Sequence, residues 1–201
     1  GRRAHKPKLF INASAVGYYG PRGDGAIDES VGPGYGFLSK VCQAWEAEAV
    51  KAERHGVRTV RLRLGVVLGA EGGAFQKMLL PFRWGLGGPI GSGHQPMSWI
   101  SLEDLIRAIM FIFEREDIQG AVNVTAPGYV SNKIFSRELG KSLARPVLMP
   151  FPSIMARLLF GEMAGALLLG GAQVAPRKLE SNGFVFKHRT LEAAFQSLLR
   201  G

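Results

Sequence analysis

Short apolar runs alternate with amphipathic stretches along the first 125 residues of the chain. Leu9 to Ala13 is a run typical of a buried parallel strand. Phe37 to Arg54 carries apolar residues at helical spacing, which predicts an amphipathic helix ending near Gly56. Val60 to Leu68 first alternates and then becomes continuously apolar, which predicts a second strand that is buried on both faces toward its end.

The same rhythm continues toward Thr125. A short helix is predicted near residues 75–82, a strand over 97–100, a helix from Leu102 to Glu114, and a strand over 121–125. Ser101, with Asp104 three residues later, resembles a capping box before the helix. Strands and helices in this order predict an α/β fold with a parallel sheet covered by helices.

The pattern changes after Pro127. Helices are predicted over 131–143, near 153–160 and 161–169, and over 190–199, with an extended stretch over 146–150. We therefore predict an α/β domain of residues 1–128 and a small, mostly helical domain of residues 129–201.

One face of the first helix is predicted to meet the core. Phe37, Val41, Trp45, Ala49 and Ala52 recur at helical spacing, while the polar face carries Lys40, Glu46 and Lys51. Trp45 and Trp99 are accordingly predicted to be core residues without a chemical role.

Composition and charge narrow the classes of protein. Hydrophobic residues make up 46% of the 201 residues and charged residues 20%, as in ordinary globular proteins. The net charge of +9 is scattered along the chain and no aromatic platform accompanies it, so nucleic acid is disfavoured as a partner. An anionic dinucleotide or nucleotide sugar would use the same charge. Neither the amino terminus nor residues 154–175 has the pattern of a secretory signal or a membrane span.

The single Cys42 excludes an intramolecular disulfide and a cysteine-cluster metal site. No two histidines stand at ligand spacing, so we expect no metal site. We expect an intracellular, reducing compartment: the cytoplasm, or an organelle such as the mitochondrion or chloroplast.

Several segments in order carry a resemblance to a known family. They are residues 13–20 (ASAVGYYG) after the first strand, 45–49 (WEAEA), 63–69 (RLGVVLG), the glycine-rich stretch 81–95, 98–105 (SWISLEDL) and 182–184 (NGF). Together they resemble the extended short-chain dehydrogenases/reductases. Their amino-acid sequences are similar to those of an atypical branch of that family, the sugar-nucleotide-epimerase-family or cell-division-inhibitor-like proteins. The resemblance implies the C-terminal part of a doubly wound Rossmann-like parallel sheet, followed by a small helical domain.

The resemblance also implies roles for particular residues. Ser14, Tyr18 and Lys40 would be catalytic, with Ser14 orienting a substrate hydroxyl, and NADP or NAD would be the cofactor. Lys40, Gly65, Val66 and Val67 would bind that cofactor, and the predicted substrate-binding residues are Arg83, His94, Gln95 and Ser98. For each of these residues the alternative is a purely structural role in a strand-end loop, a solvated helix or a glycine-rich loop.

Two departures from the family pattern matter. The initial strand and glycine-rich turn that hold the pyrophosphate are absent, so we expect the dinucleotide-binding half to be missing here and supplied by a longer chain or by another chain. Gly36 stands four residues before Lys40, where the family has its catalytic tyrosine. Tyr35 would lie about 140° from Lys40 on a regular helix, outside its pocket unless the helix begins after Tyr35.

These observations leave two functional hypotheses. The first is an NAD(P)-dependent oxidoreductase or epimerase-like protein that acts on a small molecule or a nucleotide sugar. The second is a non-catalytic subunit that keeps the fold as a scaffold within a larger assembly. An RNA-binding module has only the net charge in its favour.

Overall fold

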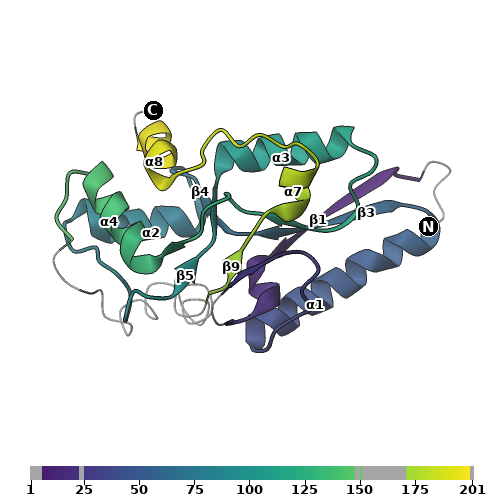
Figure 1. Ribbon diagram of the computed structural model, residues 1–201, viewed down its shortest axis with the longest axis horizontal. Coiled ribbons are helices and arrows are strands. Elements are labelled where there is room, and N and C mark those ends of the chain that lie inside the picture. The colour runs from purple at the N-terminus through teal and green to yellow at the C-terminus, as the bar shows by residue number, and fades with distance from the viewer. Residues whose placement is uncertain (1–5, 23–24, 148–149, 151–170, 200–201) are drawn as a thin grey trace.

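The computed structural model describes residues 6–22, 25–147, 150 and 171–199 (Figure 1). The helices predicted near residues 153–160 and 161–169 lie outside these residues, as does part of the extended stretch predicted over 146–150. The described chain forms a parallel sheet with helices on its faces, which confirms the predicted α/β class.

The central sheet has three parallel strands in the order β1, β3, β7. They are β1 (Leu9–Ala15), β3 (Arg58–Leu64) and β7 (Gly120–Val124). Ala15 pairs with Leu64, and Leu64 with Val124, so all three strands end level at their carboxyl ends. β1 and β3 are therefore parallel neighbours that open at the same edge of the sheet.

The strand predicted over Val60 to Leu68 is two strands, because Gly65 interrupts it. β4 (Val66–Leu68) leaves the central sheet and pairs in parallel with β6 (Trp99–Ser101). A Cβ at Gly65 would lie 2.7 Å from the carbonyl oxygen of Ser98, so glycine is needed for this close approach. The strand predicted over 97–100 is likewise divided, between β5 (Pro96–Met97) and β6.

Helix α1 (Phe37–Val50) continues into the 3-10 helix η2 (Lys51–His55) and packs on β1 and β3. Its buried face is rotated from the predicted one: Cys42, Glu46 and Ala49 are buried, whereas the Trp45 side chain is 55% exposed. The prediction that Trp45 belongs to the core is therefore wrong. The rotation follows from Glu46, which was assigned to the solvent face but has a buried ionic partner on β3.

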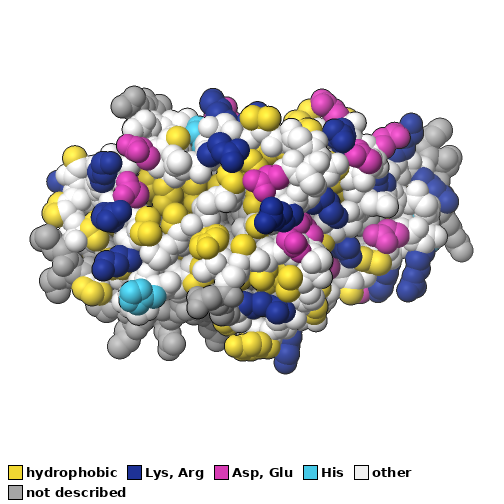
Figure 2. All heavy atoms as spheres, in the orientation of Figure 1, with side chains coloured by type: hydrophobic (Ala, Val, Ile, Leu, Met, Phe, Trp, Pro, Cys, Tyr) yellow, Lys and Arg dark blue, Asp and Glu magenta, His cyan; other side chains and the backbone are white. Residues whose placement is uncertain are grey.

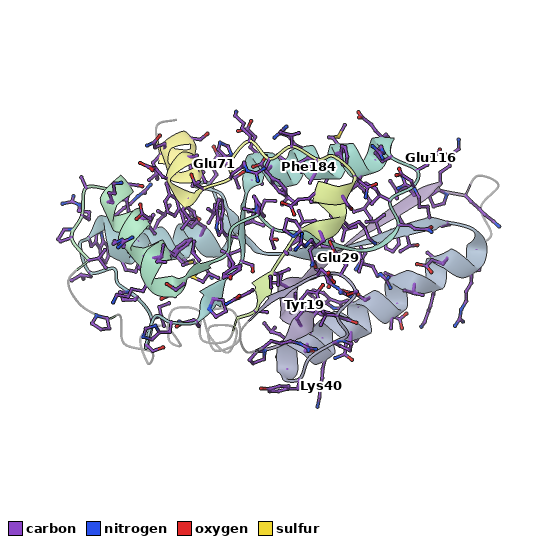
Figure 3. The ribbon with its side chains drawn as sticks, viewed as in Figure 1. Tyr19, Glu29, Lys40, Glu71, Glu116 and Phe184 are labelled. Atoms are coloured by element: carbon purple, nitrogen blue, oxygen red, sulfur yellow. The ribbon has the colours of Figure 1, made fainter. Side chains whose placement is uncertain are left out.

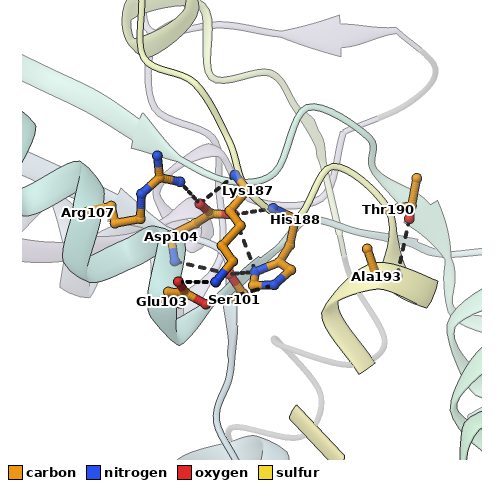
Figure 4. A network of polar contacts seen from close by, with 8 residues as sticks. All are labelled: Ser101, Glu103, Asp104, Arg107, Lys187, His188, Thr190 and Ala193. Atoms are coloured by element: carbon orange, nitrogen blue, oxygen red, sulfur yellow. Dashed lines mark hydrogen bonds and ion pairs between the residues drawn. The ribbon is translucent and has the colours of Figure 1, made fainter. Parts of the chain in front are cut away.

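Helix α3 (Leu102–Glu114) covers the opposite face of the sheet, where Val60 and Leu62 pack against it (Figure 1). The Ser101 hydroxyl caps the helix by accepting a hydrogen bond from the backbone N–H of Asp104 at 3.1 Å. The Asp104 carboxylate accepts the backbone N–H groups of Lys187 and His188 at 2.9 and 2.8 Å (Figure 4). This network ties the C-terminal part of the chain to the start of α3.

The elements after residue 129 pack onto those before it. They are β8 (Val130–Ser131), α4 (Asn132–Ser142), β9 (Gln173–Val174), α7 (Arg177–Ser181) and α8 (Leu191–Leu199). β8 pairs with β5, and β9 pairs with β2 (Ala26–Ile27). Phe135 of α4 and Phe195 of α8 share a core with Phe75 of α2 (Gly73–Arg83). The predicted helices over 75–82, 102–114, 131–143 and 190–199 are confirmed, and the division into domains at residue 129 stays a prediction.

On the face shown in Figure 2, Lys and Arg side chains are spread among acidic ones and do not gather in one block. None of the helices in the described part of the chain combines the length and the apolar character needed to cross a membrane.

Candidate functional site

A cavity of about 860 Å³ opens where the carboxyl ends of β1 and β3 meet. Its walls come from the end of β1, the loop before α1, strand β4 with the start of α2, and residues 171–172. Gly36, Gly72 and Gly73 line it, and a Cβ added at any of them would meet nothing within 4 Å. The carboxyl edge of a doubly wound sheet is where such folds bind ligands.

The cavity brings together five of the residues predicted from the sequence to form the site. They are Ser14, Gly65, Val66, Val67 and Ser98. Tyr18, Lys40, Arg83, His94 and Gln95 are not among the residues that line it. The functional roles of all ten stay predictions.

Ser14 lies buried at the end of β1, with 4% of its surface exposed. Its hydroxyl donates a hydrogen bond to Oε1 of Glu46 at 2.9 Å. A serine hydroxyl has one proton and two lone pairs. Because Ser14 donates that proton in its hydrogen bond to Glu46, its hydroxyl can only accept hydrogen bonds from a ligand in the cavity.

Glu46 is itself held by Arg63 of β3. Nε of Arg63 donates to Oε1 of Glu46, and Nη2 donates to Oε2, each at 2.9 Å, and both residues are buried. Burial by itself would lower the pKa of Arg63, but its hydrogen bonds and charge interactions with Glu46 and Tyr19 raise that pKa above its ordinary value. This bidentate pair fixes the carboxylate that orients Ser14.

The polar chain continues from Arg63 toward β9. Nη1 of Arg63 donates to the Tyr19 hydroxyl at 2.9 Å, and that hydroxyl donates to Oδ1 of Asn123 at 2.7 Å. Nδ2 of Asn123 then donates to the carbonyl of Ala175 at 3.0 Å. Burial raises the pKa of Tyr19, although its hydrogen bonds with Arg63 and Asn123 oppose that rise, so the phenol stays protonated and can donate.

Several predicted site residues have structural contacts instead. The guanidinium of Arg63 lies 3.4 Å from the ring centroid of Tyr18. The Ser98 hydroxyl donates to the carbonyl of Ala172 at 2.9 Å and accepts the N–H of Val174 at 3.1 Å, which anchors β9. The Gln95 side chain donates to the carbonyl of Ile90 at 2.9 Å.

The remaining predicted residues are exposed. Lys40, Arg83 and His94 all reach solvent. Lys40 lies on the outer side of α1, away from Tyr19 (Figure 3). The described structure therefore does not bring Lys40 to the cavity that contains Ser14.

Tyr35 lines the cavity, whereas Lys40 does not. α1 begins at Phe37 and Gly36 adopts φ 99°, so the helix starts after Tyr35 and the angle of about 140° expected on a regular helix does not apply. Gln76 and Lys77 of α2 also line the cavity. Gln76 and Lys77 were not among the predicted site residues, although they follow the carboxyl end of β4, where ligand-binding loops of this fold begin.

Among the described residues, no group of three or more His, Cys, Asp or Glu side chains could hold a metal ion. Cys42 is a free, buried thiol, and burial raises its pKa, which makes it a poor nucleophile.

A parallel sheet covered by helices, with a glycine-walled cavity at its carboxyl edge, defines the class of doubly wound α/β proteins. Residues 2–125 match the NAD dependent epimerase/dehydratase family, and residues 151–198 match a domain of unknown function, DUF1731. The chain belongs to the NAD dependent epimerase/dehydratase family.

Individual relatives agree with this assignment. The Mycobacterium leprae epimerase family protein ML0860 is 42% identical over 187 residues, covering 93% of this chain and 61% of that protein. The chloroplastic SDR39U1 homologue of Arabidopsis thaliana is 37% identical, covering 97% of this chain and 56% of that protein. The crystal structure of human epimerase family protein SDR39U1 with NADPH superposes with a TM-score of 0.90 at 36% identity, covering 100% of this chain and 68% of the human one. The chain thus spans about three fifths of the length of these two sequence relatives.

Proposed function

We propose that this chain forms the nicotinamide and substrate end of an NAD(P)-dependent oxidoreductase or epimerase-like protein. The observation that carries the proposal is the 860 Å³ cavity at the carboxyl edge of the sheet, with the oriented Ser14 among the residues that line it. Its volume falls within the range of about 300–1,000 Å³ typical of cofactor and ligand sites. The human relative that shares this fold is known in a structure with NADPH, which supports NADP or NAD as the cofactor here.

The residues present fit a flat nicotinamide ring. The cavity is lined mainly by apolar side chains, and Gly36, Gly72 and Gly73 leave room that any larger residue would fill. Gly65, Val66 and Val67 line the same wall, in agreement with their predicted cofactor-binding role. When bound, the cofactor supplies or takes up a hydride.

The chain's own side chains would orient the substrate and move its proton. Ser14, whose proton is held by Glu46, would accept a hydrogen bond from a substrate hydroxyl and so fix the carbon that bears it. Tyr18 and Lys40 remain predicted catalytic residues, although neither lines the cavity. Tyr35 is a further candidate for proton transfer because its side chain lines the cavity.

The substrate class proposed is a small molecule or nucleotide sugar with a hydroxyl-bearing carbon, and Arg83, His94, Gln95 and Ser98 remain its predicted binding residues. We propose a reducing, intracellular compartment, in keeping with one bacterial and one chloroplastic relative. No observation favours the alternative of a non-catalytic scaffold.

We further propose that additional strands pack beside β1. In the described sheet β1 is an edge strand, paired on one side with β3. Helix α3 also presents an apolar stripe of half-exposed side chains: Leu102, Ile106, Met110 and Phe113. A strand and helix carrying the glycine-rich pyrophosphate turn, on a longer chain or another chain, would cover both features.

The proposal is tested by saturation-transfer NMR of NADPH with the 201-residue chain. We expect weak binding in which the nicotinamide protons receive more saturation than the adenine protons, because the cavity holds the nicotinamide end. Gly72→Leu should weaken this binding on the order of tenfold or more, since the new side chain occupies the cavity.

Gly32→Leu is the matched control. Gly32 also has open space around its Cβ position, but it does not line the cavity, so NADPH binding should be unchanged. Stronger saturation of the adenine protons, or equal loss in the two variants, would contradict the proposal. Micromolar binding by this chain would contradict the view that a separate pyrophosphate-binding half is needed.

A further inference from the structure

A second hollow lies at the amino ends of the strands, on the opposite edge of the sheet from Ser14. It has a volume of about 540 Å³ and shares no lining residue with the cavity described above. Its walls come from η2, from the residues around the start of β3 and from Gln119 and Gly120 at the start of β7. We call it the Arg61 groove, after the β3 residue that lines it.

Arg61 has an unused hydrogen-bonding capacity. Its Nε is a buried donor without a hydrogen-bond partner, and none of the described residues makes a hydrogen bond with its guanidinium. Oε2 of Glu46 lies 4.0 Å from Nε of Arg61, which is beyond hydrogen-bond distance. Glu46 already accepts hydrogen bonds from Ser14 and Arg63. Buried unpaired donors are costly and rare in folded proteins, so one beside a groove calls for a ligand.

Arg58, which lines the same groove, has a structural role and differs from Arg61 in its hydrogen bonds. Its guanidinium donates to the carbonyl oxygens of Ile112, Arg115 and Ile118 at 3.3, 2.9 and 2.8 Å, at the end of α3 and just beyond it. The charge of Arg58 is therefore engaged by the fold. Arg61, on the same strand, has only a 4.0 Å contact with Glu46, and its Nε has no hydrogen-bond partner among the described residues.

A second cation stands beside Arg61. A Cβ placed on Gly120 would lie 3.4 Å from Nη2 of Arg61 and 3.9 Å from Nζ of Lys178, so both cations reach the same point. Nζ of Lys178 donates one hydrogen bond, to the carbonyl oxygen of Gln119 at 2.9 Å. Burial lowers the pKa of Lys178, Glu29 opposes this, and the positive charges of Arg61 and Arg63 add to the lowering, so both arginines lie near enough to act on Lys178.

We propose that the Arg61 groove binds the phosphate group of a small organic phosphate, with Arg61 and Lys178 as its ligands. A guanidinium matches the geometry of phosphate oxygens, and a lysine adds a point charge. The groove's volume exceeds what a bare phosphate ion needs and lies in the range of small-molecule sites, about 300–1,000 Å³, so it leaves room for an organic body. Glu53, the acidic residue in its wall, would disfavour ligands carrying many negative charges near η2.

The test is an NMR titration of the 201-residue chain with glycerol 3-phosphate, followed at the backbone amides of Gln119 and Gly120. Orthophosphate and sulfate form separate arms. We expect saturable shifts with glycerol 3-phosphate and weaker ones with orthophosphate. Arg61→Gln and Lys178→Gln should each weaken binding on the order of tenfold, the usual effect of losing a charge-assisted hydrogen bond.

Arg54→Gln is the matched control, because Arg54 is an exposed residue of η2 outside the groove's lining. It should leave the affinity unchanged. Equal weakening by Arg54→Gln would show attraction by net charge alone and overturn the proposal, as would the absence of saturable shifts. Orthophosphate binding as tightly as glycerol 3-phosphate would overturn the assignment to an organic phosphate. Lys178→Gln keeps the test decisive if Arg61→Gln fails to fold.

Discussion

Arg61 and Arg63 lie two residues apart on the same face of β3, yet their environments differ. Arg63 is bidentate with Glu46, donates to Tyr19 and lies against Tyr18, so its charge is paired and each of its three guanidinium nitrogens donates a hydrogen bond. Arg61 makes no hydrogen bond with the described residues and borders an open groove. Removing one partner of a buried, hydrogen-bonded charge is costly to the fold, whereas a donor without a hydrogen-bond partner is available to a ligand.

The largest effect is expected from Glu46→Ala. This change leaves Arg63 as a buried charge without its carboxylate, which costs about 3–5 kcal/mol of the free energy of unfolding. Urea denaturation would measure it. Replacing Arg63 by Met in the same chain should recover much of the loss. A loss below about 1 kcal/mol would show that the ion pair is not essential to the fold.

Tyr19→Phe should have a smaller effect. It leaves Oδ1 of Asn123 and Nη1 of Arg63 without their partner, at a cost of about 1–3 kcal/mol. The pKa of Tyr19 is raised in the folded state, so above about pH 10 the unfolded chain loses its phenol proton first and stability falls with rising pH. Urea denaturation at a series of pH values should show this part of the decline in the original chain and not in Tyr19→Phe.

Arg61→Met should change the free energy of unfolding least, by no more than about 0.5 kcal/mol, because no hydrogen bond is lost. Thermal unfolding without added phosphate would check this. A loss similar to that of Glu46→Ala would mean that Arg61 is a structural residue, and the contrast between the two arginines would fail.

The fold was largely predictable because hydrophobic periodicity reports burial directly. It located β1, α3 and β7 nearly to the residue. It failed at α1, where a buried Glu46 takes the inward position and Trp45 faces solvent. The hydrophobic pattern places charged residues at the surface. It therefore cannot identify Glu46 as a buried carboxylate, because its partner Arg63 lies 17 residues later on strand β3.

The candidate site was only partly predictable. Ser14 and the segment from Gly65 to Val67 were predicted from the resemblance to the extended short-chain dehydrogenases, and they line the cavity at the ends of two neighbouring strands. The place of Tyr35 in the cavity was not predicted, because helical spacing alone does not show that α1 begins only at Phe37. The Arg61 groove has no sequence signature, since it depends on Lys178 lying beside β7, more than 50 residues away along the chain.

The hydrogen-bonded series Ser14, Glu46, Arg63, Tyr19 and Asn123 links five positions spread over 110 residues of sequence. Substitutions at contacting positions are not additive, since the effect of each depends on the partners that remain. These five residues therefore form one epistatic unit: a change at any one alters which residues the other four can accept. In the divergence of this family, such a unit should change by joint replacement, and the orientation of the Ser14 hydroxyl would be inherited with the whole set.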